Sequence, residues 1–234
     1  SSLQRLGLGG LKRRAAEELV RAVFGEKAPD EFVARSVEQA GGNVFFLEEL
    51  LRHVAERGTW DIPDSVLAMA QSRLEALPPE ARHLLRAGSI FGRVFWGGGA
   101  QSLVAEQISA DDAATWLDSL VESEILEVQP HSRFPAFREF SFRHNLFREA
   151  AYAMLTDRDQ KVGHRLAAEW LASEGEPEPL VVAEHYERAG QNESAIPFLL
   201  RAAQTSFDVG NLEATLNIAN RGLAYGAEGE DRGK

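Results

Sequence analysis

The spacing of the apolar residues departs from the helical period in only one part of this chain, which limits the folds it can adopt. Almost every other segment repeats its apolar residues every three or four positions, as an amphipathic helix does. Residues 125–129 and 137–142 instead alternate like strands, and Pro130 begins a turn between them. Phe140 and Phe142 fall on one face of the second strand. The sequence therefore predicts a mostly α fold with one small β-hairpin.

The first part of the chain, 1–58, predicts a helical bundle. A helix over 12–24 ends at Gly25, and a second helix opens at Pro29 and closes at Gly41 and Gly42. Asn43 is placed to cap a third helix, 44–57, because its side chain can accept a hydrogen bond from a free backbone N–H. The period predicts these inward residues: Phe32, Val33, Ser36, Val37 and Ala40 in the second helix, and Leu47, Leu50, Leu51 and Val54 in the third.

Residues 59–156 predict a winged-helix domain, because three helices followed by a two-stranded hairpin is its order of elements. A helix capped by Asp64 or Ser65 runs to Leu77, and the next occupies 80–91 after two prolines. The three glycines 97–99 predict a loop before a short helix at about 100–107. The last helix runs from Ser109, which has capping-box spacing to Asp112, through Ser123.

The last part, 157–234, predicts helical repeats. Residues 187–196 can be laid on 207–216, and each copy has a helix end, a glycine turn and a helix start. The first copy fits a tetratricopeptide (TPR) pattern, so we expect TPR-like α-hairpins whose inner groove is the partner site. Three aromatic residues are placed to line that groove or to fill the core of the repeats: Tyr186, Phe198 and Phe207. The charged, glycine-rich tail, 227–234, predicts a frayed end.

Composition excludes several classes of protein. The net charge of −11 makes general attraction to nucleic acid unfavourable, and without cysteine there is no disulfide framework or thiolate chemistry. The sequence contains neither a membrane-length apolar run nor a signal-peptide core. We therefore expect a cytoplasmic protein with no membrane partner. Because the chain starts abruptly in the apolar stretch 6–11, we expect a piece of a longer protein.

Motifs for catalysis are missing from the sequence. Residues 7–12 are rich in glycine but lack the spacing of a phosphate-binding loop, and no nucleophile or metal-ligand motif occurs. Four histidines fall inside helices and are expected at solvated or core-edge positions: His53, His83, His164 and His185. His131 lies in the wing turn and is expected to be exposed. The chain is therefore expected to have no catalytic site and no metal site.

Arg143 and His144 stand where a strand ends and a helix begins. A helix N-terminus presents free N–H groups and a positive dipole, so this corner favours an anion. The alternative role is structural, with His144 capping the helix or packing. Residue chemistry alone favours that structural role.

Two motifs resemble the STAND class of bacterial signalling ATPases, which are related to AAA proteins. Residues 41–50, GGNVFFLEEL, resemble the family's GGNPFFLEEL, and residues 142–152, FRHNLFREAAY, resemble its FRHALLREAAY. Between them, residues 74–82, LEALPPEAR, resemble RLDRLPPEAR. The order and spacing of these motifs agree over nearly the whole chain.

The resemblance implies a regulatory region made of a lid, a winged helix and the start of a repeat array. A nucleotide-binding core with Walker motifs would precede it in the same protein and would bind ADP or ATP with Mg. The family's Asn-Pro turn meets the adenine, so Asn43 and Val44 are implied contacts, although Val44 replaces the proline. His144 matches a histidine that touches the β-phosphate of ADP in related receptors. With the resemblance, phosphate sensing by His144, beside Arg143, becomes the favoured role.

Two other functions remain open from the sequence. A DNA-binding winged helix would read DNA with residues 111–123, but that helix carries Asp111, Asp112, Asp118 and Glu122 and no basic residue. A free-standing helical scaffold would bind a protein partner and would need neither a core nor His144. A Walker sequence in the same polypeptide would separate the first function from the scaffold. An oligomer is expected in the active state of the switch.

Overall fold

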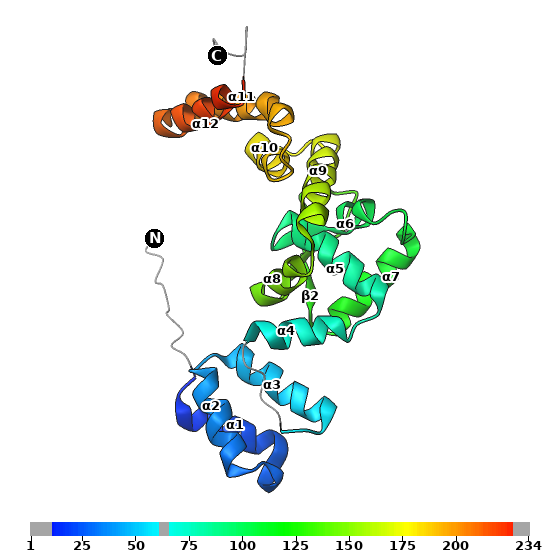
Figure 1. Cartoon of the computed structure of the whole chain (residues 1–234), viewed down its shortest axis with the longest axis vertical. Coiled ribbons are helices and arrows are strands. Elements are labelled where there is room, and N and C mark those ends of the chain that lie inside the picture. Colours follow the sequence, from blue (N-terminus) through cyan, green and yellow to red (C-terminus); the bar gives the residue numbers. More distant parts are fainter. Residues whose placement is uncertain (1–10, 61–65, 227–234) are drawn as a thin grey trace. The chain divides into compact units, whose positions relative to one another are not determined.

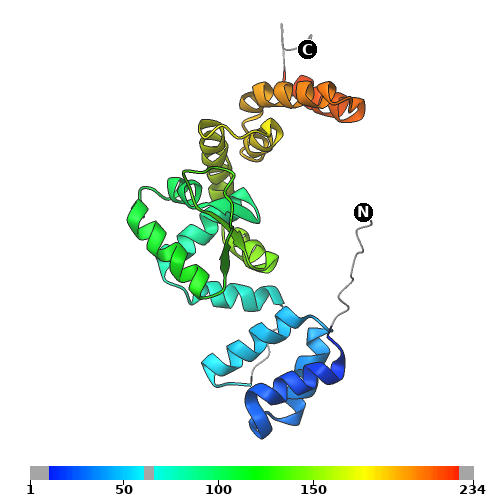
Figure 2. The same cartoon turned by 180° about the vertical axis from the view of Figure 1, so that it is seen from behind.

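The computed structural model describes residues 11–60 and 66–226 (Figures 1 and 2). It divides into two compact units, Ser1–Arg73 and Leu74–Lys234, which we describe separately. Helices dominate both units, and the described strands form one three-stranded antiparallel sheet. The predicted fold class, mostly α with a small β element, is confirmed. The glycine-rich start, the cap at Asp64 or Ser65 and the tail lie outside the described residues.

The first unit is a small helical bundle, blue to cyan in Figure 1. It contains α1 (Arg13–Phe24), the 3-10 turn η1 (Gly25–Lys27), α2 (Asp30–Ala40), α3 (Val44–Arg57) and most of α4 (Val66–Glu75). The inward faces predicted for α2 and α3 are confirmed, because all nine predicted side chains are buried. They share one core with Ala16 and Val20 of α1 and Met69 of α4.

Local polar contacts set where these helices begin and how they are joined. The Asn43 side chain accepts from the backbone N–H of Phe46 at 3.2 Å, which confirms the predicted cap of α3. Gly41 ends α2 in the left-handed region at φ 53°, where a side chain would be strained. The guanidinium of Arg73 binds both carboxylate oxygens of Glu49, and Glu49 is almost fully buried. This ion pair links α4 to α3.

The second unit begins with the elements of a winged helix. They are α5 (Pro79–Phe91), β1 (Val94–Trp96), α6 (Gly97–Leu103), α7 (Ala110–Glu122), β2 (Leu126–Val128), β3 (Glu139–Phe142) and α8 (Asn145–Ala153). The strands lie in the order β1-β3-β2, so the hairpin strand β3 is central. Phe95 pairs with Phe140 in one ladder, and Leu126 pairs with Phe142 in the other. All four side chains are buried.

The sequence analysis missed one element of this unit and was wrong about another. The strand β1 was not predicted, because three residues are too few to show a period. The glycines 97–99 were predicted as a loop but form the first turn of α6. They are needed for space: a Cβ on Gly98 would lie 2.3 Å from the ring of Phe137, and one on Gly99 would lie 3.0 Å from that of Phe91. The glycines therefore let aromatic rings pack directly on the helix backbone.

The rest of the second unit is a series of helices, each packed on the one before. They are α9 (Asp157–Ser173), α10 (Pro179–Arg188), α11 (Asn192–Asp208) and α12 (Leu212–Ala224), coloured yellow-green to red in Figure 1. The turns at Gly190 and Gly210 have matching left-handed φ angles of 74° and 77°. In each turn the next residue donates to the carbonyl five positions back at 2.9 Å. The predicted equivalence of the two turns is confirmed.

The assignment of domains stays a prediction. Sequence predicted boundaries after residues 58 and 156, whereas the structure has one boundary, after Arg73. Most of α4 therefore joins the first unit, and the other winged-helix elements form one unit with the later helices. The physical reason is an aromatic cluster shared by both parts, which contains Trp96 and Phe134 from the winged helix and Trp170 from α9.

Candidate functional site

His144 lies at the junction that the sequence predicted, immediately before α8. It occupies the N-cap position, and its carbonyl accepts from the backbone N–H of Phe147 at 3.1 Å. The imidazole is half-buried, and its centroid lies 6.4 Å from that of the Phe147 ring. The ring therefore packs against the first turn of α8, at the end of the helix where the dipole is positive.

Arg143 makes this corner less cationic than the sequence suggested. Its Nη1 donates to the Glu124 carboxylate at 3.2 Å, and its Nε lies 3.8 Å from the Glu127 carboxylate. Glu124 has a φ of 59°, a left-handed conformation that costs a non-glycine residue energy. An anion at the N-terminus of α8 would have to compete with these two carboxylates for Arg143.

Asn43 and Val44 are neighbours at the start of α3. The Asn43 side chain is engaged in capping, while Val44 is 42% exposed. Both residues belong to the first unit, and Arg143 and His144 belong to the second. The predicted site residues therefore form two pairs of sequence neighbours, one pair in each unit. The predicted nucleotide contacts of all four residues stay predictions.

A chain of hydrogen bonds in the second unit was missed by the sequence analysis. The Nδ1 atoms of His164 and His185 lie 2.9 Å apart, and the Tyr152 hydroxyl lies 3.0 Å from Nε2 of His164. Both histidines are buried, so the predicted solvated or core-edge placement is wrong for them. A signal was present: His164 shares a helical stripe with the buried residues Ala167, Ala168 and Leu171. The exposed position predicted for His131 is confirmed.

Burial lowers the pKa of both histidines. The pKa of His164 falls from 6.5 to about 4, first because burial disfavours the charged ring and second because Arg188 is nearby. The pKa of His185 falls to about 3, again first through burial and then through His164 and Arg188. Both rings are therefore neutral at pH 7. One proton lies between the two Nδ1 atoms, so one ring donates and the other accepts.

The turn between β2 and β3, the wing of this fold, packs two aromatic side chains against the second unit, while most of its residues are exposed. Phe134 is 6% exposed, and its ring centroid lies 4.7 Å from that of Trp96 and 5.3 Å from that of Trp170. Phe137 also packs on Trp170, at 5.4 Å. The wing therefore lies against α9 and is not a projecting loop.

Two carboxylates fix the wing by polar contacts. Glu139 accepts from the indole N–H of Trp96 and from the backbone N–H of Arg133, both at 2.8 Å. The guanidinium of Arg133 donates at 2.7 Å to Glu176, whose side chain is fully buried in the turn after α9. Arg133 thus links the wing to the turn that leads into α10.

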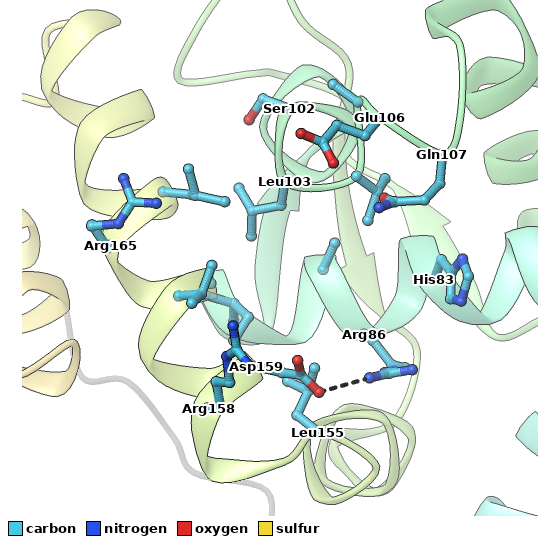
Figure 3. A pocket seen from close by; sticks show the side chains of 17 residues that line it. His83, Arg86, Ser102, Leu103, Glu106, Gln107, Leu155, Arg158, Asp159 and Arg165 are labelled. Atoms are coloured by element: carbon cyan, nitrogen blue, oxygen red, sulfur yellow. Dashed lines mark hydrogen bonds and ion pairs between the residues drawn. The ribbon is translucent and has the colours of Figure 1, made fainter.

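A groove runs between α5, the end of α6 and the first part of α9 (Figure 3). Its volume is about 910 Å³, and apolar side chains from all three helices line much of it, including Ile90, Leu103 and Val162. Figure 3 shows Arg165 on the α9 side and Glu106 on the α6 side. The groove was not predicted, because its walls are far apart in sequence.

The charges of this groove are largely compensated within the chain. Arg86 pairs with Asp159 at 3.4 Å, and Arg165 pairs with Glu169 at 2.7 Å. The pKa of Asp159 is lowered, chiefly by its hydrogen bonds with Thr156 in the capping box of α9. The groove therefore presents apolar area with two paired arginines at its edge, and Arg158 and Glu106 add one charge of each sign.

The helix that would read DNA in a DNA-binding winged helix is α7, and its outer surface is acidic. Four acidic residues on it are exposed: Asp111, Asp112, Asp118 and Glu122. Arg138, the nearest cation, pairs with Asp118 at 2.7 Å. Phosphate groups would be repelled by this surface.

Within residues 11–60 and 66–226, no group of three or more His, Cys, Asp or Glu side chains is arranged to hold a metal ion. The helices of the same ranges include none that is long and apolar enough to cross a membrane. Comparison with models of known protein families finds none that matches the chain, and comparison with curated proteins finds no significant match.

Proposed function

We propose that this chain is the non-catalytic regulatory and interaction region of a STAND signalling ATPase of the bacterial cytoplasm. In this proposal a nucleotide-binding core in the same polypeptide holds ADP or ATP with Mg. The winged helix senses the nucleotide through His144, and the TPR-like helices bind a protein partner or signal. The chain itself performs no chemistry.

The observation that supports this proposal most is the packing of the wing against α9. Trp96, Phe134 and Trp170 form one aromatic cluster, with Trp96 and Trp170 stacked at 5.7 Å. Packed cores are not continuously deformable, so a displacement of the winged helix moves α9 with it. A rigid link between the sensing domain and the helical repeats is what a nucleotide-controlled switch requires.

The charges of the winged helix argue against reading DNA. A winged helix that binds DNA uses its third helix and often its wing, and here the third helix is acidic. Counterion release, the main source of affinity for DNA, needs exposed Lys and Arg that contact phosphates. The two arginines of the wing, Arg133 and Arg138, are already paired with Glu176 and Asp118.

A phosphate-sensing role for His144 rests on its position at the N-terminus of α8. Free backbone N–H groups at a helix N-terminus bind phosphate oxygens, and an imidazole beside them can add one directed donor. ADP contacting both the core and His144 would favour the closed state by its differential affinity for that state. A hydrogen bond to a charged group contributes about 1.5–3 kcal/mol, which corresponds to about a 10- to 100-fold change in affinity.

The test is ADP release from the polypeptide that carries the core, compared for the unmodified protein and His144→Ala. We expect the substitution to speed ADP release about tenfold or more. The matched control is His131→Ala, which removes an exposed histidine from the wing turn and should leave release unchanged. Equal release from His144→Ala and the unmodified protein would overturn phosphate sensing. A polypeptide without Walker motifs would overturn the whole proposal.

A free-standing helical scaffold is the second candidate, and the apolar groove between α5, α6 and α9 favours it. Such a protein would bind its partner without any nucleotide, so partner binding would not change when ADP replaces ATP. The switch proposal requires that change, because both ligands act on one equilibrium between two states.

A further inference from the structure

The last helix of the described chain, α12, presents an apolar surface to solvent. Of the twelve large apolar side chains that are exposed in the described residues, five lie between positions 207 and 223. Their exposed fractions are 57% for Phe207, 77% for Val209, 61% for Leu212, 64% for Leu216 and 43% for Leu223. Monomeric proteins seldom expose a concentration of apolar side chains of this size without a binding partner.

The residues on α12 follow the spacing of a helix–helix seam. Leu212, Leu216, Ala219 and Leu223 are separated by four, three and four positions, so they form one stripe along the helix. The side that packs on α11 lies next to this stripe: Ile218 and Gly222 are the buried residues of α12, and the half-buried Ala219 packs at the edge of the same core. We call the four residues 212, 216, 219 and 223 the α12 stripe.

The α12 stripe matches itself when a second helix runs in the opposite direction. A two-fold axis between positions 217 and 218 sets Leu212 opposite Leu223 of the partner subunit at both ends. At the centre it sets Leu216 opposite Ala219 of the partner subunit, so a large side chain meets a small one. Such alternation lets two helices interdigitate closely.

Charge does not oppose this pairing. Beside the α12 stripe the flanking residues on one side are Glu213, Asn217 and Asn220, and on the other they are Thr215 and Gly222. The same two-fold axis sets Glu213 opposite Gly222 of the partner subunit, so like charges are not brought together. Arg221 is already held by Glu187 through two hydrogen bonds on the side of the stack. The antiparallel arrangement also sets the two helix dipoles in opposite directions, which is favourable.

The area fits an interface between two copies. Five apolar side chains of these exposures offer on the order of 300–500 Å². One side of an ordinary protein interface covers about 800 Å², of which somewhat more than half is apolar. Phe207 and Val209, at the turn between α11 and α12, extend the α12 stripe toward that size.

We propose that the α12 stripe is the contact surface for a second copy of this chain, with the two α12 helices packed antiparallel about a two-fold axis. The contact is isologous, since each copy offers the same surface, and it closes as a dimer. It is independent of the proposed nucleotide switch, because it uses residues of α12 and the preceding turn only.

Sedimentation equilibrium of the chain at neutral pH tests the proposal. We expect a monomer–dimer equilibrium at micromolar to tens of micromolar concentration, and we expect Leu216→Glu to weaken it at least tenfold. The matched control is Val23→Glu, which places the same charge at a 51% exposed apolar position of α1 and should leave association unchanged. Circular dichroism should show that Leu216→Glu folds normally, since the replaced side chain is mostly exposed.

A charge-pair experiment tests the direction of the helices. Leu212→Lys and Leu223→Glu should each weaken the dimer, and the double variant should restore it, because each lysine then faces a glutamate of the partner subunit at both ends. A chain that is monomeric at about 100 µM would overturn the proposal, and so would a dimer that is lost in the longer polypeptide, because a following helix of the repeat array would then cover the α12 stripe. A dimer that Leu216→Glu leaves intact would overturn it too, and a double variant no better than the single ones would rule out the antiparallel pairing.

Discussion

His164 and His185 lie with their Nδ1 atoms 2.9 Å apart in the interior of the second unit, and the Tyr152 hydroxyl continues the chain of hydrogen bonds. The pair joins α9 to α10, and Tyr152 joins both to α8. Since only one proton fits between the two nitrogens, the contact is lost when the accepting ring also gains a proton on Nδ1 and becomes a second donor. The winged helix and the helical repeats are therefore linked by a contact that depends on the accepting histidine staying neutral.

The free energy of unfolding should fall as the pH is lowered from about 6.5 to about 4. The pKa of His164 is lowered to about 4 and that of His185 to about 3, whereas both titrate near 6.5 when unfolded. In this window the unfolded chain binds more protons than the folded chain, so stability rises with pH. Together the two shifts correspond to a loss of about 5 kcal/mol between pH 7 and 4.5, measured by denaturant unfolding at pH 7, 5.5 and 4.5.

Comparison with a double variant, His164→Leu with His185→Leu, isolates this effect because carboxylates titrate in both proteins. Its stability should depend less on pH between 6.5 and 4 than that of the unmodified chain. His131→Ala, at an exposed position, should behave as the unmodified chain does. If the double variant kept the same pH dependence, the buried pair would not be its source.

Gly98→Ala should destabilise the second unit. A Cβ at this position would lie 2.3 Å from Cδ1 of Phe137, so the ring would have to leave its place against Trp170. Overpacking of this kind costs about 1–3 kcal/mol, and a position in the first turn of α6 gains little from helix propensity. Thermal or denaturant unfolding measures the change.

Gly222→Ala in α12 is the matched control for that substitution. The nearest atom to its Cβ would be Cβ of Leu199 at 4.0 Å, which is ordinary contact. Without a clash, alanine should stabilise the helix by up to about 1 kcal/mol. Equal effects of the two substitutions would mean that the close approach of Phe137 to Gly98 does not constrain the fold.

Glu176→Ala should loosen the wing. It removes the acceptor that holds the Arg133 guanidinium, whose side chain is 42% exposed and can return to water. We therefore expect a cost of about 1–2 kcal/mol, less than for a pair buried on both sides. Hydrogen exchange should become faster at the backbone amides of residues 131–137.

The control for this change is Glu169→Ala in α9. Glu169 pairs with Arg165 at 2.7 Å, but both side chains are more than a third exposed, 48% for Glu169 and 35% for Arg165. Exposed pairs contribute about 0–1 kcal/mol, so wing exchange should not change. If Glu176→Ala also left wing exchange unchanged, the aromatic cluster alone would hold the wing.

The elements that sequence predicted well are set by local interactions. The faces of α2 and α3 follow from a regular period, and the cap at Asn43 needs only the next three residues. Strand β1 could not be predicted, since it exists only through pairing with β3. The helical glycines at 97–99 were misread because their reason is the packing of Phe137 and Phe91, which come from other elements.

The residues of the candidate site also differ in whether local sequence or contacts between distant elements determine their positions. The position of His144 before α8 follows from the strand–helix junction and was predicted. The pairing of Arg143 with Glu124 and Glu127 depends on how α7, β2 and β3 meet, so no local pattern indicates it. The His164–His185 contact likewise needs two helices to be brought together. The stripe of buried residues on α9 could by itself have indicated that His164 faces inward.

Calorimetric titration of ADP with Mg into this chain tests whether the nucleotide site lies mostly on a separate core, as we propose. We expect no saturable binding up to about 1 mM, which corresponds to a binding free energy no stronger than about −4 kcal/mol. Saturable binding in the micromolar range would contradict the account, since it would mean that the chain holds a complete nucleotide site of its own.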